Sequence, residues 1–547
     1  MRITRHGRNA QDYKMTAKAG KDDNVLTRSL RVDSQEWPRK SASTAFFGLL
    51  RGRVGWLVVA AAMYVVLNIV VAPAGFYPIH QDDYVVLGSG LERVTFFSER
   101  PVSNNIAFLL GYLGSVASYA VLNLLTVLVP VLVLWFVSVF LQVRVKWPAA
   151  VLCFAIVFGD ASAFEHGKYL GLISNLCSHF FGTCSLLLLL WAARGGDRSR
   201  AAWAGSAFLL SAFSKEDFLL PVAIMAAVLL LEQARAKGLL HPGTRRAGGA
   251  LLMVGLLIGA AVAYNLLRSS PFLAGMSGPP VSSAAAYAVD TNPLHLVSSF
   301  WRLTATYVPL ASIAALIGLA AAWALAPSRR LRLACLALMT CSLVLPYALI
   351  PNNSPGYRAF AWLPWLAATA AIGIQLVSDR VTARSGWSKI MAGVLVLALS
   401  ATAVYFLWRP RMVIAGWYGQ VQAMNSRMGR SLVTHRAAIL AAPQVAVIGM
   451  EGLSPWSNNN GEYLSRRLGF RGVWVVFVNG NSDRFHLDPP GFQPADLPPA
   501  DRITVQPLSR LCEWPDIPAL TYDGQGTGVL GTTASACASM RGANAPR

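Results

Sequence analysis

Two adjacent carboxylates, Asp82 and Asp83, stand in the short polar segment His80-Gln81-Asp82-Asp83-Tyr84. Neighbouring side chains of an extended segment point in opposite directions, so the two acids are not expected to share one proton. One of them could act as a general base while a hydrogen bond or a cation holds the other. A base that is shielded from water binds a proton more strongly, which suits that role. The alternative is that both acids are simply solvated in a polar loop.

The composition is that of a membrane protein. Of the 547 residues, 54% are hydrophobic and only 13% are charged, whereas a soluble domain carries about 25% charged residues. The formal net charge of +21 would suggest nucleic-acid binding in a soluble protein. In a membrane protein, excess Lys and Arg normally mark the cytoplasmic loops, so no nucleic-acid partner is expected.

The sequence predicts about eleven transmembrane helices. Lys215-Glu216-Asp217 interrupts the region 201–231, which we interpret as a hairpin of two short spans. On this count the loops 235–246, 329–332 and 380–389 are cytoplasmic and carry ten basic residues, against three in the opposing loops. Counting one span would invert this bias and break the positive-inside rule. The predicted spans are 54–74, 119–143, 147–164, 169–193, 201–213, 218–231, 247–267, 304–326, 332–350, 359–377 and 389–408.

The predicted topology divides the chain into four parts. Residues 1–52 form a basic, disordered cytoplasmic tail, and 53–408 form the transmembrane domain. Residues 409–523 form a periplasmic domain, and 524–547 a flexible tail rich in Gly, Ala, Ser and Thr. In this topology, polar residues that are scattered along the sequence lie at the same outer surface of the membrane. They are Asp82, Asp83, Asp160, Glu165, His166, Lys215, Glu216, Asp217, Tyr357 and Arg358.

The part after residue 408 is expected to be a small α/β domain. Residues 445–449 and 473–478 are short β-branched runs, and the polar stretch 457–468 between them fits a helix. Cys512 and Cys537 lie in this polar part and form a disulfide candidate if it faces an oxidising compartment. The other five cysteines lie in apolar runs, where a small buried side chain is expected.

Two further segments of the outer side have open interpretations. Residues 104–118 are apolar but short for a membrane crossing, which favours a helix lying in the interface and covering a cavity. The loop 268–303 is rich in Pro, Ser and Ala and contains no predicted span. It is either a lid or a plain connector.

The order of the polar motifs resembles that of the GT-C superfamily of membrane glycosyltransferases. After the Asp82-Asp83 pair come Glu99-Arg100-Pro101 and the run to Asn123, then Ser214-Lys215-Glu216 at the tip of a short hairpin. Gly356-Tyr357-Arg358 comes just before a late apolar stretch ending in Leu363-Pro364. The resemblance covers about residues 54–408 and is closest to the bacterial members and to protein O-mannosyltransferases of the tetratricopeptide-linked type. No tetratricopeptide repeats follow in this chain.

The resemblance implies an all-α, polytopic, GT-C-like fold and an inverting transfer of a sugar from a polyprenyl-phosphate donor. The reaction would take place on the periplasmic face of a bacterial inner membrane, with a glycan, lipid or protein as acceptor. Asp82 would be the general base and Asp83 its support, with His80 beside them. Lys215 and Arg358 would stabilise the leaving phosphate. Glu216 and Tyr357 belong to the substrate-binding motifs, and Arg100 either joins them or orders the first loop.

Asp160, Glu165 and His166 form a second polar group. They could bind the sugar or a divalent cation such as Mg²⁺ or Mn²⁺, with Asp160 as the metal ligand. A histidine beside an acid is more often structural. His179, inside an apolar span, is expected to be a hydrogen-bonded core residue. The sequence shows no zinc-ligand spacing, phosphate-binding glycine loop or serine-hydrolase elbow.

Two other functions use the same side chains. In a transporter or flippase for lipid-linked glycans the charges would line a path, but such a protein is expected to have ionisable residues near the membrane centre and inverted repeats. Here most acids collect at one face, and the sequence shows no repeat. A glycan polymerase would also work on the outer side and would join preassembled lipid-linked units.

Overall fold

The computed structural model describes the chain in stretches separated by gaps. They are residues 42–70, 100–113, 115–195, 198–237, 292–350, 356–385, 389–449, 473–478 and 503–543, with short pieces between 248 and 263. His80, Asp82, Asp83 and the predicted helix 457–468 lie outside the described residues.

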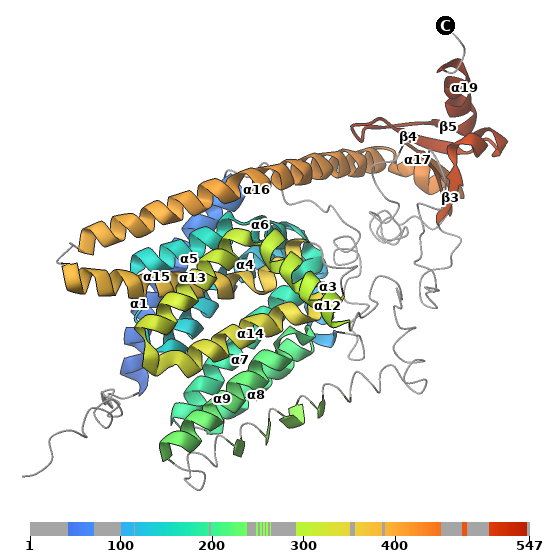
Figure 1. Cartoon of the computed structure of the whole chain (residues 1–547). Helices are drawn as coiled ribbons and strands as arrows, with labels where there is room; N and C mark the ends of the chain where they lie inside the picture. Colours follow the sequence, from blue (N-terminus) through green and yellow to red (C-terminus); the bar gives the residue numbers. More distant parts are fainter. Residues whose placement is uncertain are drawn as a thin grey trace, which may run out of the picture. The chain divides into compact units, whose positions relative to one another are not determined.

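The described residues up to 441 are helical, as the apolar composition predicts (Figure 1). Alanine and leucine dominate these segments, and both are strong helix formers. The main helices are α1 (Ala42–Val65), α3 (Pro101–Leu113), α4 (Ser115–Leu141), α5 (Trp147–Gly159), α6 (Ala161–Lys168), α7 (Ile173–Gly195), α8 (Arg198–Ala212), α9 (Leu219–Lys237), α12 (Pro293–Trp301), α13 (Pro309–Leu325), α14 (Arg330–Ala348), α15 (Leu363–Ser385), α16 (Lys389–Thr434) and α17 (Arg436–Ala441).

Several of these helices can cross a membrane. Within the described ranges, five helices are long and apolar enough, and up to seven if two bent pairs each count as one span. The pairs are α5 with α6, bent by 67°, and α12 with α13, bent by 98°. The exact number of eleven spans is therefore not confirmed. The region 247–267 is described only in short pieces, and α8 has 15 residues, fewer than a usual span.

Polar side chains join α9 and α14 at both ends, so the two helices run antiparallel. At one end, Arg332 donates from Nε and Nη2 to the two carboxylate oxygens of Glu232, at 2.6 and 2.9 Å. Near the other end, the Tyr347 hydroxyl donates to Oδ2 of Asp217 over 2.9 Å. These contacts fix which loops share an end of the bundle.

The end that carries Arg332 also gathers other loop contacts. Lys146 pairs with Asp379, and Nε2 of Gln375 donates to the Arg144 carbonyl over 2.6 Å. Arg329 donates to the carbonyl of Gln142 over 3.2 Å. The loops 143–146 and 329–332 and the last part of α15 are predicted to be cytoplasmic, and these contacts bring them together.

A glycine pair allows α13 and α15 to approach closely. A Cβ atom added at Gly373 would lie 2.2 Å from the Cα atom of Gly318, and one added at Gly318 would lie 2.8 Å from Ala370 Cα. No side chain larger than hydrogen fits at either position. Small residues at helix contacts are typical of membrane bundles, where van der Waals packing drives association.

A five-stranded sheet forms near the C-terminus, with the order β3-β2-β1-β4-β5. The parallel strands β1 (Gln444–Ile448) and β2 (Val473–Val478) confirm the two predicted β-branched runs. Strand β3 (Ile503–Pro507) is parallel to β2, and β4 (Pro518–Tyr522) is parallel to β1. Strand β5 (Gly528–Thr532) closes the edge antiparallel to β4.

Both faces of β1 are covered. Val445 and Val447 pack in one cluster with Met428 and Leu432 of α16. Ala446 and Ile448 pack in a second cluster. The alternation follows from the two-residue period of a strand, and burial on both faces explains why β1 is apolar throughout.

Two predicted boundaries differ from the structure. The tail 524–547 was expected to be flexible, but it contains β5 and the helix α19 (Thr533–Ala543). Backbone pairing with β4 and the Cys512–Cys537 disulfide hold this segment despite its low-complexity composition. The expected start of the C-terminal domain at 409 lies inside α16, which continues through Pro410 to Thr434.

The predicted connector 268–303 ends in a helix. Asn292 caps α12 by accepting a hydrogen bond from Leu294 N over 3.0 Å, and Pro293 occupies the first helical position. Both residue types favour a helix start at these places. Residues 268–291 lie outside the described part of the chain.

The disulfide gives a first test. Replacing Cys512 and Cys537 together by serine should lower the stability of the sheet by about 3 kcal/mol, because the bridge closes a loop with a sequence separation of 25. Trypsin cleavage within residues 508–543 should become faster under oxidising conditions. Cys341→Ser, at an exposed free cysteine, is the matched control. Equal cleavage rates in the double variant and the wild type would contradict a stabilising role.

Candidate functional site

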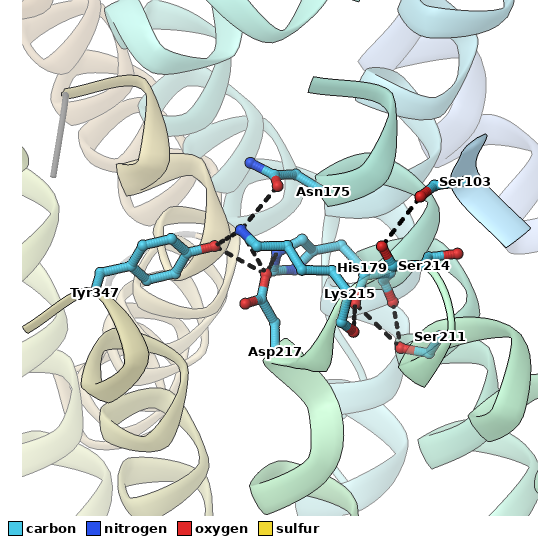
Figure 2. Close-up of polar contacts among 9 residues, drawn as sticks. Ser103, Asn175, His179, Ser211, Ser214, Lys215, Asp217 and Tyr347 are labelled. Carbon is cyan, nitrogen blue, oxygen red and sulfur yellow. Dashed lines mark hydrogen bonds and ion pairs between the residues drawn. The ribbon is translucent and has the colours of Figure 1, made fainter. Parts of the chain in front are cut away.

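The connection between α8 and α9 is held by backbone contacts from two other helices. Ser103, in the first turn of α3, donates to the carbonyl of Ser214 over 3.1 Å. Ser178 of α7 donates to the carbonyl of Lys215 over 2.9 Å, and Ser211 Oγ donates to the carbonyl of Ser178 over 2.8 Å. Figure 2 shows Ser103, Ser211 and Ser214 around the start of the turn. The predicted hairpin tip is therefore a fixed part of the bundle.

The Lys215 ammonium group is the centre of a polar cluster (Figure 2). Nζ donates to Asn175 Oδ1 over 2.8 Å and to the Tyr347 hydroxyl, and it lies 3.4 Å from Asp217 Oδ2. It also lies 4.5 Å from the centroid of the Tyr347 ring. All three donor positions of the ammonium group thus have polar neighbours.

Asp217 is the counter-charge of this cluster. Its Oδ2 atom accepts from Tyr347 and lies 3.4 Å from Nε2 of His179. The side chains of Asp217 and His179 are only 3% and 1% exposed, so each needs a polar partner inside the bundle. His179 was expected to be a hydrogen-bonded core residue. Its burial is confirmed, but neither ring nitrogen has a hydrogen-bond partner among the described residues, and Asp217 is its nearest counter-charge.

Lys215 lies in the connection before the 3₁₀ turn η5 (Glu216–Phe218), outside the apolar spans. Burial lowers the pKa of Lys215 to about 8, because it penalises the charged form. The nearby Asp217 carboxylate opposes this shift, while Arg100 and Arg358 add to it. The ammonium group is therefore cationic at neutral pH but titrates at a lower pH than a solvated lysine.

Arg358 and Tyr357 come from the 3₁₀ segment η9 (Gly356–Ala361), which follows α14 in the chain. The Arg358 guanidinium lies 5.5 Å from the Tyr347 ring centroid, on the ring that Lys215 also contacts. Tyr357 packs edge-on against Tyr169, with 5.8 Å between ring centroids. Two cations from distant parts of the sequence thus meet at one aromatic ring.

His166 belongs to the same neighbourhood through α6. Its ring stacks on Phe360 of η9 with 4.4 Å between centroids, and its charge would interact with those of Lys215 and His179. Nδ1 donates to the carbonyl of Ser162 over 2.9 Å. In the neutral ring, this leaves Nε2 as a hydrogen-bond acceptor.

Asp160 and Glu165 have other contacts. Asp160 caps α6, because its Oδ1 atom accepts from N and Oγ of Ser162 at 2.9 and 2.6 Å. Oε1 of Glu165 accepts from the Tyr418 hydroxyl of α16 over 3.4 Å. Among the described residues, no group of three or more His, Cys, Asp or Glu side chains could hold a metal ion. The metal role of Asp160 stays a prediction.

The structure brings together a large part of the predicted site. Lys215, Arg358, Tyr357 and His166 meet at one end of the bundle, and Arg100 interacts electrostatically with Lys215. Glu216 is exposed. Sequence reasoning did not include Asn175, Asp217 and Tyr347 among the site residues. Asp217 stands in the charged run that marked the hairpin, whereas Asn175 and Tyr347 lie in apolar helices without a distinguishing pattern.

Asp217 offers a test of the cluster. Asp217→Asn keeps the shape of the side chain but leaves the buried Lys215 cation without its counter-charge, at a cost on the order of 3 kcal/mol. The unfolding temperature in detergent micelles should therefore fall clearly. Glu216→Gln removes the neighbouring, exposed carboxylate and should leave the unfolding temperature unchanged. Equal effects of the two substitutions would show that Asp217 does not stabilise the cluster.

No known family model matches the chain, and no curated protein matches it. Among solved structures, the chain is similar to the crystal structure of ArnT from Cupriavidus metallidurans in the apo state. The TM-score is 0.45 at 13% sequence identity, and the match covers 88% of this chain and 94% of that one. A match at this level carries no inference about activity, which has to come from the chemistry of the residues.

Proposed function

We propose that the chain is an inverting glycosyltransferase that takes a sugar from a polyprenyl-phosphate donor and passes it to an acceptor hydroxyl or amine. The observation that carries this proposal is the cationic cluster around Tyr347. Lys215 and Arg358 both contact its ring, and Arg100 interacts electrostatically with Lys215. Asp217 neutralises one of these three charges. Cations held in place in this way would suit an anionic group such as a phosphate.

The leaving group of this reaction explains why such a cluster would help. When the bond from the anomeric carbon to the phosphate oxygen breaks, negative charge grows on the lipid phosphate. Cations that are already fixed in place stabilise that charge without reorganising at the moment of reaction. Contacts with Asn175, Asp217 and Tyr347 fix Lys215 in this way.

Asp82 is proposed as the general base. It would take the proton of the acceptor as the acceptor oxygen or nitrogen attacks the anomeric carbon from the face opposite the phosphate. The single displacement inverts the configuration and releases polyprenyl phosphate. Asp83 would support the base, and His80, Tyr357 and His166 are proposed to contact the substrates. The Nε2 acceptor of neutral His166 would suit a sugar hydroxyl.

The proposed location is the periplasmic face of a bacterial inner membrane. The loops rich in Lys and Arg gather at the Arg332 end of the bundle, and Lys215 lies at the opposite end of α9. By the positive-inside rule the Arg332 end would face the cytoplasm. A disulfide in the C-terminal sheet favours an oxidising compartment for that part. A donor anchored in the bilayer would explain why a transferase needs so many apolar helices.

The charge on Lys215 can be tested through pH. Because its pKa is lowered to about 8, the cation is present below that pH and is lost as the pH rises through it. Transfer should therefore decline with rising pH around this value. Lys215→Arg should keep its charge and flatten the decline, and Lys215→Met should reduce transfer by about 100-fold or more at every pH. Membranes supplied with extracted polyprenyl-phosphate sugars provide the assay. If the transfer rate of Lys215→Arg declines with rising pH in the same way as that of the wild type, Lys215 is not the group whose titration causes the decline.

The base is tested by Asp82→Asn. The amide cannot take a proton, so transfer should be abolished while the protein level in the membrane is unchanged. Surface glycans of a deletion strain that carries this variant should have the same masses, by mass spectrometry, as those of the deletion strain. Glu513→Gln, at an exposed carboxylate outside the proposed site, should restore the wild-type glycans. Restoration by Asp82→Asn would refute the role of Asp82 and favour a transport function.

A further inference from the structure

Arg411 of α16 is a buried cation that the proposed reaction does not use. Its side chain is 1% exposed and belongs to the largest fully buried side chains of the described chain. Neither Nε nor Nη1 has a hydrogen-bond partner among the described residues. Burying a guanidinium group without an anionic partner is costly, and Arg is rarely buried in this way. A compensating group is therefore expected.

Aromatic rings surround the guanidinium. Its Cζ atom lies 5.7 Å from the ring centroid of Trp408 and 5.9 Å from that of Phe164. Tyr64 of α1 interacts with it electrostatically. Glu165, the acid next to Phe164, makes its described hydrogen bond to Tyr418 instead. Ring contacts favour a cation but do not replace hydrogen bonds to its N–H groups.

The position of Arg411 along α16 fits the headgroup level of a bilayer. Arg411 lies 22 residues after Lys389, where α16 begins, which corresponds to about 33 Å along the helix. The hydrocarbon core of a bilayer is about 30 Å thick. With Lys389 at one membrane surface, Arg411 would therefore reach the headgroup level of the opposite surface.

The helix α6 separates this position from the Lys215 cluster. Phe164 contacts the Arg411 guanidinium, while His166 stacks on Phe360 of η9. Residues of α6 therefore contact the surroundings of two groups of cations. Lys215 and Arg358 form one group, and Arg411 is the other.

We propose that Arg411 binds the phosphate group of a membrane lipid, at a site distinct from the Lys215 cluster. A guanidinium offers several N–H donors to phosphate oxygens and is well suited to this ligand. The aromatic rings of Trp408 and Phe164 would keep water from the ion pair. The phosphate could belong to a polyprenyl carrier or to a glycerophospholipid, because both present it at the headgroup level.

The test measures lipid binding and does not depend on sugar transfer. The full chain is purified in dodecyl maltoside micelles, which contain no phosphate, and its unfolding temperature is followed while undecaprenyl phosphate or phosphatidylglycerol is added. At least one lipid should raise the unfolding temperature of the wild type. Arg411→Gln should need a roughly tenfold higher concentration of that lipid for the same shift.

Arg409→Gln is the matched control, because it removes an exposed arginine two residues earlier on the same helix. It should respond to lipid like the wild type. Without lipid, Arg411→Gln should unfold at or above the wild-type temperature, since an unpartnered buried charge is removed. If Arg411→Gln does not fold, Arg411→Lys serves instead, with a weakened lipid response. Lys215→Met leaves Arg411 in place. The rise in unfolding temperature that depends on Arg411 should therefore persist in this variant.

The lipid that loses its effect in Arg411→Gln identifies the source of the phosphate. Loss with undecaprenyl phosphate alone assigns the site to the carrier, and loss with phosphatidylglycerol alone assigns it to the bilayer. The proposal is overturned if Arg411→Gln and Arg409→Gln respond equally to both lipids. A wild-type chain that responds to neither lipid overturns it as well. Failure of the transferase proposal would not alter any of these outcomes.

Discussion

The ion pair between Lys215 and Asp217 is the constraint on which the described site depends. The two side chains are 12% and 3% exposed, so neither charge can be left without a partner in the bundle. The pair requires Tyr347 from α14, Asn175 and His179 from α7, and a turn that lets both charges face inward. Two helices and one connection are thereby fixed relative to one another at the end of the bundle that also carries Arg358.

Two cations meet at this end of the bundle, because Lys215 and Arg358 both lie against the ring of Tyr347. Holding like charges close together is unfavourable unless negative charge lies near them, as the Asp217 carboxylate does for Lys215. Arg411 is a further buried cation, and it packs against the rings of Phe164 and Trp408.

The sequence predicted the parts of the fold that depend on composition and period. Apolar runs predicted the helices, and β-branched runs predicted β1 and β2. Charge bias predicted that Lys215, Tyr357 and Arg358 share an end. The sequence did not identify Tyr347 as a site residue, because a tyrosine in an apolar helix looks like an ordinary core residue. The end of α16 was misplaced because Arg409 and Arg411 look like a span boundary, whereas Arg411 is buried among aromatic rings.

The continuity of α16 mechanically links the sheet to the bundle. Arg427 donates to the carbonyl of Gln525, and Ser431 accepts from Gly528 N over 2.9 Å, so the far half of the helix is fastened to the β4–β5 hairpin. Pro410 interrupts the ladder one residue before Arg411 and is where a helix bends most readily. A force on the hairpin would therefore be transmitted along α16 toward Pro410 and the neighbouring buried guanidinium.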